Sequence, residues 1–202
     1  MPFNTDTRPP LKVFISSTYE DLKAYVHAAE EMLREQKFKF DQFKYWEATG
    51  RPSVSECRER VGACDALVVI IGRTYGWIPP VDEGGDGQSS ITKREVQWAL
   101  EKPMPVLPFF IEKPESPLSG SIPDTREERL LADFVAQLRK KLMKIVSSPE
   151  AFRLALRHSL QQLTLKYPLT TYNLPSQVGE MTQGRYQHFL DHKKVGNVSK
   201  PL

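Results

Sequence analysis

The chain has 202 residues, of which 40% are hydrophobic, 26% charged and 10% aromatic. These proportions describe one soluble domain, or one domain with a helical extension, and exclude a second module as large as an ATPase. No stretch approaches the ~18 consecutive apolar residues of a membrane-spanning helix, and the N-terminus lacks the apolar core of a secretory signal, so we expect a cytoplasmic protein with no membrane partner. The 28 basic and 25 acidic residues are too evenly balanced for a dedicated nucleic-acid-binding protein.

Four short apolar runs predict the strands of a sheet. Runs rich in β-branched and aromatic residues lie at 11–15, 38–46, 66–71 and 104–111. The run at 66–71 does not alternate, which is typical of a central strand covered on both faces, whereas 38–46 alternates imperfectly, as an edge strand does. Pro105 and Pro108 favour a sheet edge or a bulge for the last strand.

Amphipathic patterns follow the first three strands and predict helices near 22–33, 54–64 and 90–101. Ser17 with Glu20, and Ser53 with Glu56, have the spacing of capping boxes at two helix N-termini. Glu20 and Asp21 fall in the predicted first turn of the first helix, where acidic side chains complement the helix dipole. Strands that alternate with helices over about 110 residues predict a doubly wound, flavodoxin-like parallel α/β sheet with right-handed crossovers. The Gly/Asp-rich loop at 72–88 is expected to have a mobile tip.

The C-terminal part is predicted to be helical. Apolar spacing indicates one helix over 125–145, a break at 147–149 and a second helix from 152. Residues 125–166 hold nine basic and four acidic side chains, which we interpret as a solvated helix face or a docking surface for an acidic partner domain or nucleic acid. The predicted organisation is therefore a disordered start (1–10), an α/β domain (11–123), a basic helical pair packed on it (124–166) and a polar tail (167–202).

The cysteines and histidines give no metal or redox site. Cys57 and Cys64 lie seven residues apart on a predicted helix, which places their Cα atoms ~10 Å apart, beyond the ~7 Å limit of a disulfide. We expect both to pack in the core as small hydrophobic residues. His188 and His192 have helical spacing, but no third ligand is evident, so no metal is predicted. The motifs of serine hydrolases and zinc proteases are missing from the sequence.

A ligand site is expected where the strand order reverses, because open parallel sheets bind ligands beyond the carboxyl ends of strands at that point. With the order 2-1-3-4, the reversal lies between the first and third strands. The loop after the first offers hydroxyl and backbone N–H groups for phosphate, and the loop after the third offers aromatic rings and a guanidinium for a base and a pyrophosphate. The predicted nucleotide-binding residues are Ser16, Ser17, Thr18, Gly72, Arg73, Tyr75 and Trp77.

Each of these loops also has a structural interpretation. Residues 16–18 could cap a helix, and Tyr75 and Trp77 could anchor their loop in the core. Glu95, one turn into the helix after the second loop, is the remaining candidate for chemistry, because its carboxylate could point into the crevice. Thr92 and Glu95 also have the spacing of a capping box, so helix capping is the alternative for this residue.

Three segments together resemble one known family: KVFISSTYEDL (12–22), CRERVGACDALVVIIGRTYGWIP (57–79) and SITKREVQWALEKPMPVLPFF (90–110). This is the TIR-like domain of unknown function found at the N-termini of STAND-type NTPases, in bacterial immunity systems and in animal telomerase-associated and NACHT-WD proteins. The resemblance spans about residues 11–165. The family is similar to TIR domains and, more distantly, to nucleoside deoxyribosyltransferases.

The resemblance implies that Glu95 stands where enzymatic TIR domains have their catalytic glutamate. The implied reaction is cleavage of NAD+ at its N-glycosidic bond, with no added cofactor. It also implies a homo-oligomer when active and a role in antiviral defence or cell death. Sensing is then expected from a separate sensor or NTPase protein, from self-assembly, or from a portion of the protein outside this chain. Two alternatives remain, a non-catalytic signalling or adaptor module that self-associates and a nucleoside deoxyribosyltransferase-like enzyme.

Overall fold

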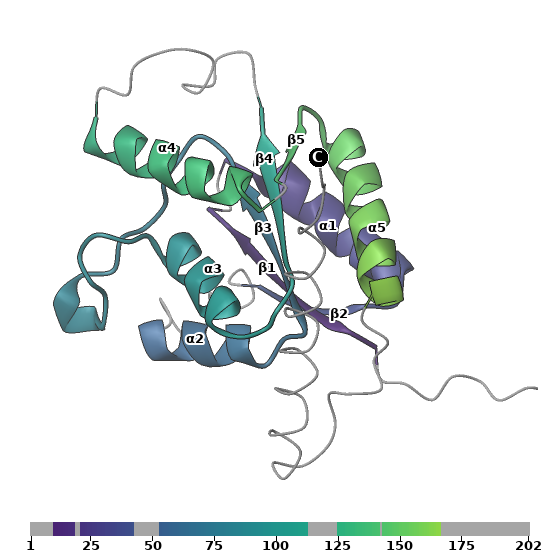
Figure 1. Ribbon diagram of the computed structural model, residues 1–202, viewed down its shortest axis with the longest axis horizontal. Coiled ribbons are helices and arrows are strands. Elements are labelled where there is room, and N and C mark those ends of the chain that lie inside the picture. The colour runs from purple at the N-terminus through teal and green to yellow at the C-terminus, as the bar shows by residue number, and fades with distance from the viewer. Residues whose placement is uncertain (1–9, 19–20, 43–52, 113–124, 142, 167–202) are drawn as a thin grey trace, which may run out of the picture. The chain divides into compact units, whose positions relative to one another are not determined.

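The computed structural model describes residues 10–18, 21–42, 53–112, 125–141 and 143–166. They contain a five-stranded parallel sheet with the order β2-β1-β3-β4-β5 (Figure 1). This order is the flavodoxin-like one, which confirms the predicted doubly wound α/β class. The strands are β1 (Lys12–Ser17), β2 (Lys39–Gln42), β3 (Ala66–Ile71), β4 (Val106–Ile111) and β5 (Lys144–Val146).

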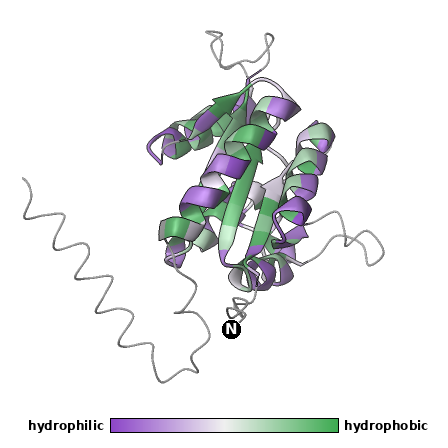
Figure 2. Cartoon of the chain, turned by 90° about the vertical axis from the view of Figure 1, so that its right-hand side faces the viewer, coloured by the Kyte–Doolittle hydropathy of each residue, from purple (hydrophilic) through white to green (hydrophobic). Residues whose placement is uncertain are grey.

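Helices cover both faces of the sheet. On one face α1 (Lys23–Glu35) and α5 (Pro149–Lys166) lie side by side (Figure 1). The other face carries α2 (Val54–Gly62), α3 (Ile91–Glu101) and α4 (Arg126–Arg139), and a short 3-10 turn, η2 (Val81–Glu83), lies in the loop before α3. Figure 2 shows the hydrophobic strands between helices whose outward surfaces are hydrophilic, as burial of apolar surface requires.

The sheet centre is apolar on both sides. All six residues of β3 are buried, as its non-alternating sequence predicts. On the α1/α5 face, the Phe152 ring meets the ring of Phe109 edge to face at 4.9 Å and that of Tyr25 at 5.9 Å. On the opposite face, residues of α2, α3 and α4 pack against β3 and β4 in one cluster.

The C-terminal segment differs from its prediction. The helix expected over 125–145 ends at Arg139, and residues 144–146 form β5, which pairs with β4. β4 therefore lies inside the sheet. Pro108 is tolerated because pairing with β5 starts only at Phe109, opposite Lys144, so at Pro108 the strand is still bordered by β3 alone.

The helix starts also test the predicted caps. Ser53 caps α2, because its side chain accepts the Glu56 N–H at 3.2 Å. Ser17 does not cap α1, whose N-cap is Leu22 and has no side-chain cap. Asp21 lies two residues before α1 begins, and the first turn of this helix has no acidic residue. The predicted complement to the α1 dipole is therefore also missing.

Hydrogen bonds within the loop between β3 and α3 hold its tip. Asp86 accepts the backbone N–H groups of Gln88 at 2.9 Å and Ser89 at 2.6 Å, and the Gly87 N–H donates to the Pro79 carbonyl at 3.2 Å. These bonds fix the tip that we predicted to be mobile. The predicted disordered start lies outside the described residues up to residue 9, as do residues 43–46 of the second predicted strand and the tail with its two histidines.

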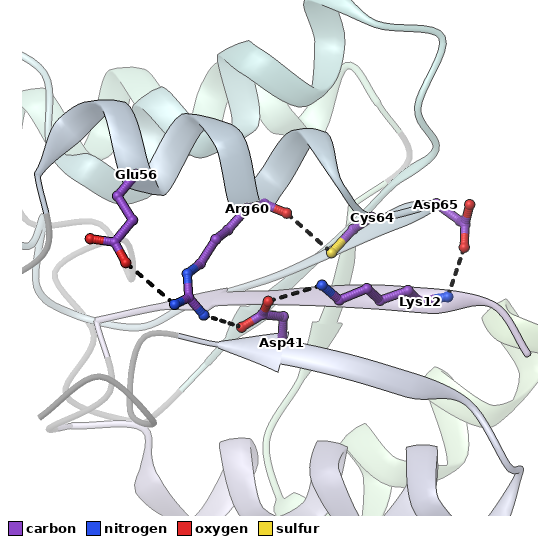
Figure 3. Close-up of polar contacts among 6 residues, drawn as sticks. All are labelled: Lys12, Asp41, Glu56, Arg60, Cys64 and Asp65. Atoms are coloured by element: carbon purple, nitrogen blue, oxygen red, sulfur yellow. Dashed lines mark hydrogen bonds and ion pairs between the residues drawn. The ribbon is translucent and has the colours of Figure 1, made fainter. Parts of the chain in front are cut away.

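A polar cluster ties α2 to β1 and β2 (Figure 3). Asp65 accepts the backbone N–H of Lys12 at 2.8 Å and returns its own N–H to the Lys12 carbonyl at 2.7 Å. The Lys12 ammonium and the Arg60 guanidinium both bind Asp41, at 3.1 and 3.5 Å. The Cys64 thiol donates to the Arg60 carbonyl at 3.3 Å. The Cys-Asp pair before β3 therefore fixes where this strand enters the sheet.

Both cysteines are buried and free, which confirms the prediction that they pack as small core residues without a disulfide. Cys57 lies on α2 beneath α3, and Cys64 lies just beyond the end of α2.

Candidate active site

The predicted reversal of strand order lies between β1 and β3. These strands are neighbours, and the chain leaves β1 for α1 on one face but leaves β3 for α3 on the other (Figure 1). Their carboxyl ends therefore border a switch point of the kind that holds ligands in open α/β sheets.

Ser16 and Glu95 meet beside this point. The Ser16 hydroxyl donates to the Glu95 Oε2 at 2.5 Å, and the two residues are 1% and 4% exposed. α3 is capped by Ser90, whose side chain accepts the Lys93 N–H at 3.3 Å. Glu95 therefore does not cap its helix, and its carboxyl is held inside the protein instead.

Burial dominates the electrostatics of this pair. It raises the pKa of Glu95 to about 8, against a smaller lowering by the Ser16 hydrogen bond. The carboxyl therefore keeps its proton at neutral pH. The Cys57 thiol has a pKa raised to about 12, first by its own burial and second by nearby Glu95. A buried carboxyl with a shifted pKa beside a switch point is typical of functional sites.

A second carboxylate, that of Asp21, joins the two loops of the switch point. Its Oδ1 accepts from the Thr18 hydroxyl at 2.5 Å and the Thr74 hydroxyl at 3.3 Å, and its Oδ2 accepts the Arg73 backbone N–H at 3.3 Å. Gly72 permits this approach, because a Cβ atom there would lie 2.6 Å from the Asp21 Oδ2. The sequence pattern predicts that Asp21 complements the α1 dipole, and it does not predict this role in joining the loops. The signal that could have identified the role is the position of Asp21 shortly after the end of a strand, where functional groups of α/β sheets lie.

The predicted binding residues divide between these two places. Ser16 lies at Glu95, whereas Thr18, Gly72 and Arg73 surround Asp21. Ser17 is half-buried and ends β1, paired with β3.

The two aromatic residues hold their loop to the protein. Tyr75 is 3% exposed, its ring stands edge to face against Phe134 at 6.5 Å, and its hydroxyl donates to the Gln88 carbonyl at 3.5 Å. The structure thus places Tyr75 in the core beneath α4 rather than at the crevice, as its structural interpretation expected. Trp77 is half-buried, and its carbonyl accepts the Ile91 N–H at 2.9 Å.

The described ranges contain neither a metal-ligand cluster nor a membrane-spanning helix. There, the structure has no group of three or more His, Cys, Asp or Glu side chains placed to hold a metal ion. The helices described there also include none that is both long and apolar enough to cross a bilayer.

Comparisons with known proteins place the chain in a family. Among solved structures, it is similar to the TIR domains of the activated Roq1 resistosome that directly recognises the pathogen effector XopQ, with 17% identity, a TM-score of 0.42 and coverage of 90% of this chain and 98% of that one. No curated protein matches the sequence. Residues 12–161, more than half of the chain, match the domain of unknown function DUF4062. The chain therefore belongs to the DUF4062 family.

Proposed function

We propose that this domain is a TIR-like enzyme that cleaves NAD+, or a related nucleotide, at its N-glycosidic bond, with Glu95 as the catalytic carboxylate. The observation that supports this proposal is the buried Ser16–Glu95 pair beside the switch point. A buried carboxyl is costly, and apolar side chains of similar volume would pack there without that cost. Retention of an acid at this place is therefore better explained by chemistry than by packing.

The reaction needs one carboxylate near the ribose. The C–N bond to nicotinamide breaks with both electrons going to the positively charged ring nitrogen, so nicotinamide leaves neutral and needs no general acid. Ionised Glu95 stabilises the oxocarbenium-like cation that develops on the ribose. The oxygen of a water molecule then bonds to the anomeric carbon and the water releases a proton, which gives ADP-ribose, nicotinamide and H+.

Glu95 must lose its proton before it can act in this way. Its pKa of about 8 belongs to a closed site, with the side chain 4% exposed. Entry of water and substrate would lower this pKa by ending the desolvation. We propose that self-association favours the open form, so that the domain is active as a homo-oligomer.

The biological setting is part of the same proposal and is supported by the family resemblance of the three sequence segments. We propose that the protein acts in the cytoplasm in antiviral defence or cell death. A separate sensor or NTPase protein would supply the trigger.

A non-catalytic signalling module is the second candidate. It is favoured by the same closed geometry, since Glu95 is 4% exposed and Tyr75 lies in the core. A self-associating adaptor needs no open crevice, and fold alone does not separate it from an enzyme.

Release of nicotinamide from NAD+ separates these candidates. The purified full chain is assayed at low and high protein concentration and with a crowding agent, beside Glu95→Gln. Glu101→Gln, an exposed acid on the same helix, is the matched control. We expect release that rises with concentration, is abolished in Glu95→Gln and is unchanged in Glu101→Gln.

Two results would contradict the proposal. No release under any of these conditions favours the adaptor, and equal release by Glu95→Gln removes this residue from the reaction. A parallel assay with a deoxynucleoside and a free base tests the third possibility, because base exchange there would indicate a deoxyribosyltransferase.

A further inference from the structure

The groups around Asp21 are suited to a phosphate. Two hydroxyls, of Thr18 and Thr74, and one backbone N–H, of Arg73, donate to its two oxygens at 2.5–3.3 Å. Hydroxyl and backbone N–H groups at the start of βα loops are common phosphate donors in α/β sheets. These are the loops in which we predicted phosphate binding, and the anion they hold is one of the chain's own carboxylates.

The surrounding geometry keeps this anion in place. The donors come from both loops of the switch point, so the carboxylate draws the loops together. Gly76, with φ of +87°, brings its backbone close to Thr18, where a Cβ atom would lie 3.0 Å from the Thr18 methyl carbon. Asp21 is half-buried, whereas Arg73 and Thr74 are exposed, so a ligand from solvent would reach the same donors.

We infer that Asp21 is an internal competitor for the diphosphate of the nucleotide ligand. Two anions a few ångströms apart repel, and both would need the same three donors. The ligand therefore binds by displacing the Asp21 carboxylate, which also releases the link between the two loops. This inference rests on the proposed function, because the ligand concerned is the nucleotide of that site.

Binding to a neutral variant tests the inference without any reaction. Affinities of the full chain and of Asp21→Asn are measured calorimetrically for ADP, which has no nicotinamide to lose, and for inorganic pyrophosphate. We expect Asp21→Asn to bind ADP about tenfold more tightly, a difference of about 1.4 kcal/mol, because the competing charge is gone. Tighter binding of pyrophosphate as well assigns the gain to the phosphates rather than to the adenosine.

Asp86→Asn is the matched control. Asp86 also accepts two backbone N–H groups, but both belong to its own loop. Loss of the Asp86 charge should leave the affinity for ADP unchanged within about twofold, which corresponds to a change in binding free energy of less than about 0.4 kcal/mol. If Asp21→Asn does not fold, as judged by circular dichroism, Asp21→Ser removes the charge while keeping a small polar side chain.

The outcomes separate this inference from the proposed function. ADP affinity that is equal or lower in the folded Asp21 variant overturns the inference, as does failure of both proteins to bind ADP. Nicotinamide release that depends on Glu95, combined with unchanged ADP affinity in the variant, would overturn the inference alone. Tighter binding by the variant without nicotinamide release from any protein would support the inference and contradict the enzyme.

Discussion

The Ser16 hydroxyl donates a hydrogen bond of 2.5 Å to the Glu95 carboxyl, which joins the end of β1 to the first turns of α3. The two residues are 79 positions apart and are nearly inaccessible to solvent. Since the pKa of Glu95 is raised to about 8, titration of this one group is coupled to folding. The pH dependence of the free energy of unfolding therefore reports on the Ser16–Glu95 pair, and the measurement needs no substrate.

Glu95→Gln should remove a loss of stability that the native protein shows as the pH rises. Between the ordinary pKa of 4.5 and the folded value of about 8, the folded state holds a proton that the unfolded state has released. Folding then takes up a proton, so the free energy of unfolding falls with pH, by roughly 1.4 kcal/mol per pH unit at most. Gln keeps the shape and still accepts from Ser16, so its profile should be flatter across this range.

Urea denaturation of both proteins at several pH values from 5 to 9 measures this difference. Glu101→Gln, which removes an exposed carboxylate of α3, should keep the slope of the native protein. Parallel curves for the native protein and Glu95→Gln would show that the Glu95 carboxyl titrates normally in the folded state.

Ser16→Ala should raise the pKa of Glu95 further. The Ser16 hydrogen bond is the factor that lowers this pKa against the effect of burial. Without it, the pH range in which stability falls extends beyond pH 8, and loss of the bond itself costs about 1 kcal/mol. Any Glu95-dependent activity should then need a more alkaline pH.

The matched control is Ser159→Ala, which removes a hydroxyl that donates to the Ala155 carbonyl within α5. In Ser159→Ala, the fall in the free energy of unfolding with pH should end at about pH 8, as in the native protein. If Ser16→Ala and Ser159→Ala give the same pH profile, the Ser16 bond does not influence the ionisation of Glu95.

The parts of the fold predicted correctly are those with a strong local signal. The apolar run of β3 has no alternation, and the structure buries all of it. β5 was missed because its three residues are too few to show a period, and exposed Ile145 continued the helical spacing of α4. Pro108 favoured a sheet edge for β4, and this was wrong, because β5 pairs with the residues that follow Pro108 and places β4 inside the sheet.

The candidate site could likewise be predicted only where the sequence carried a local signal. Placing Ser16 and Glu95 at one point required only the strand order, which the alternation of strands and helices made predictable. Which way Tyr75 turns depends on α4, since Phe134 covers its ring, and no pattern around residue 75 contains that information. Asp21 has the sequence setting of an ordinary helix-dipole acid, and its three donors come together only in the folded loops.

Tyr75→Ala should destabilise the protein strongly, whereas Tyr75→Phe should not. The ring is buried against Phe134, so truncation to alanine leaves a cavity worth about 3–5 kcal/mol. Its hydroxyl makes one long bond, 3.5 Å, to the Gln88 carbonyl, and its loss should cost under about 1 kcal/mol. Trp77→Ala, at a half-buried position of the same loop, should fall between them. Urea unfolding that finds Tyr75→Ala as stable as the native protein would place the ring outside the core.

The two cysteines should be unreactive in the folded protein and reactive in the unfolded chain. Burial raises the pKa of both thiols to about 12, so almost no thiolate forms at pH 8, and both residues are buried. Labelling by a maleimide must then wait for unfolding, which makes it at least about 1,000-fold slower than labelling in denaturant. Gln97→Cys, at an exposed position of α3, supplies a third thiol that should react at once under native conditions. Mass spectrometry counts the labels, and rapid modification of Cys57 would mean that α2 separates from α3 without global unfolding, opening the protein beside Glu95.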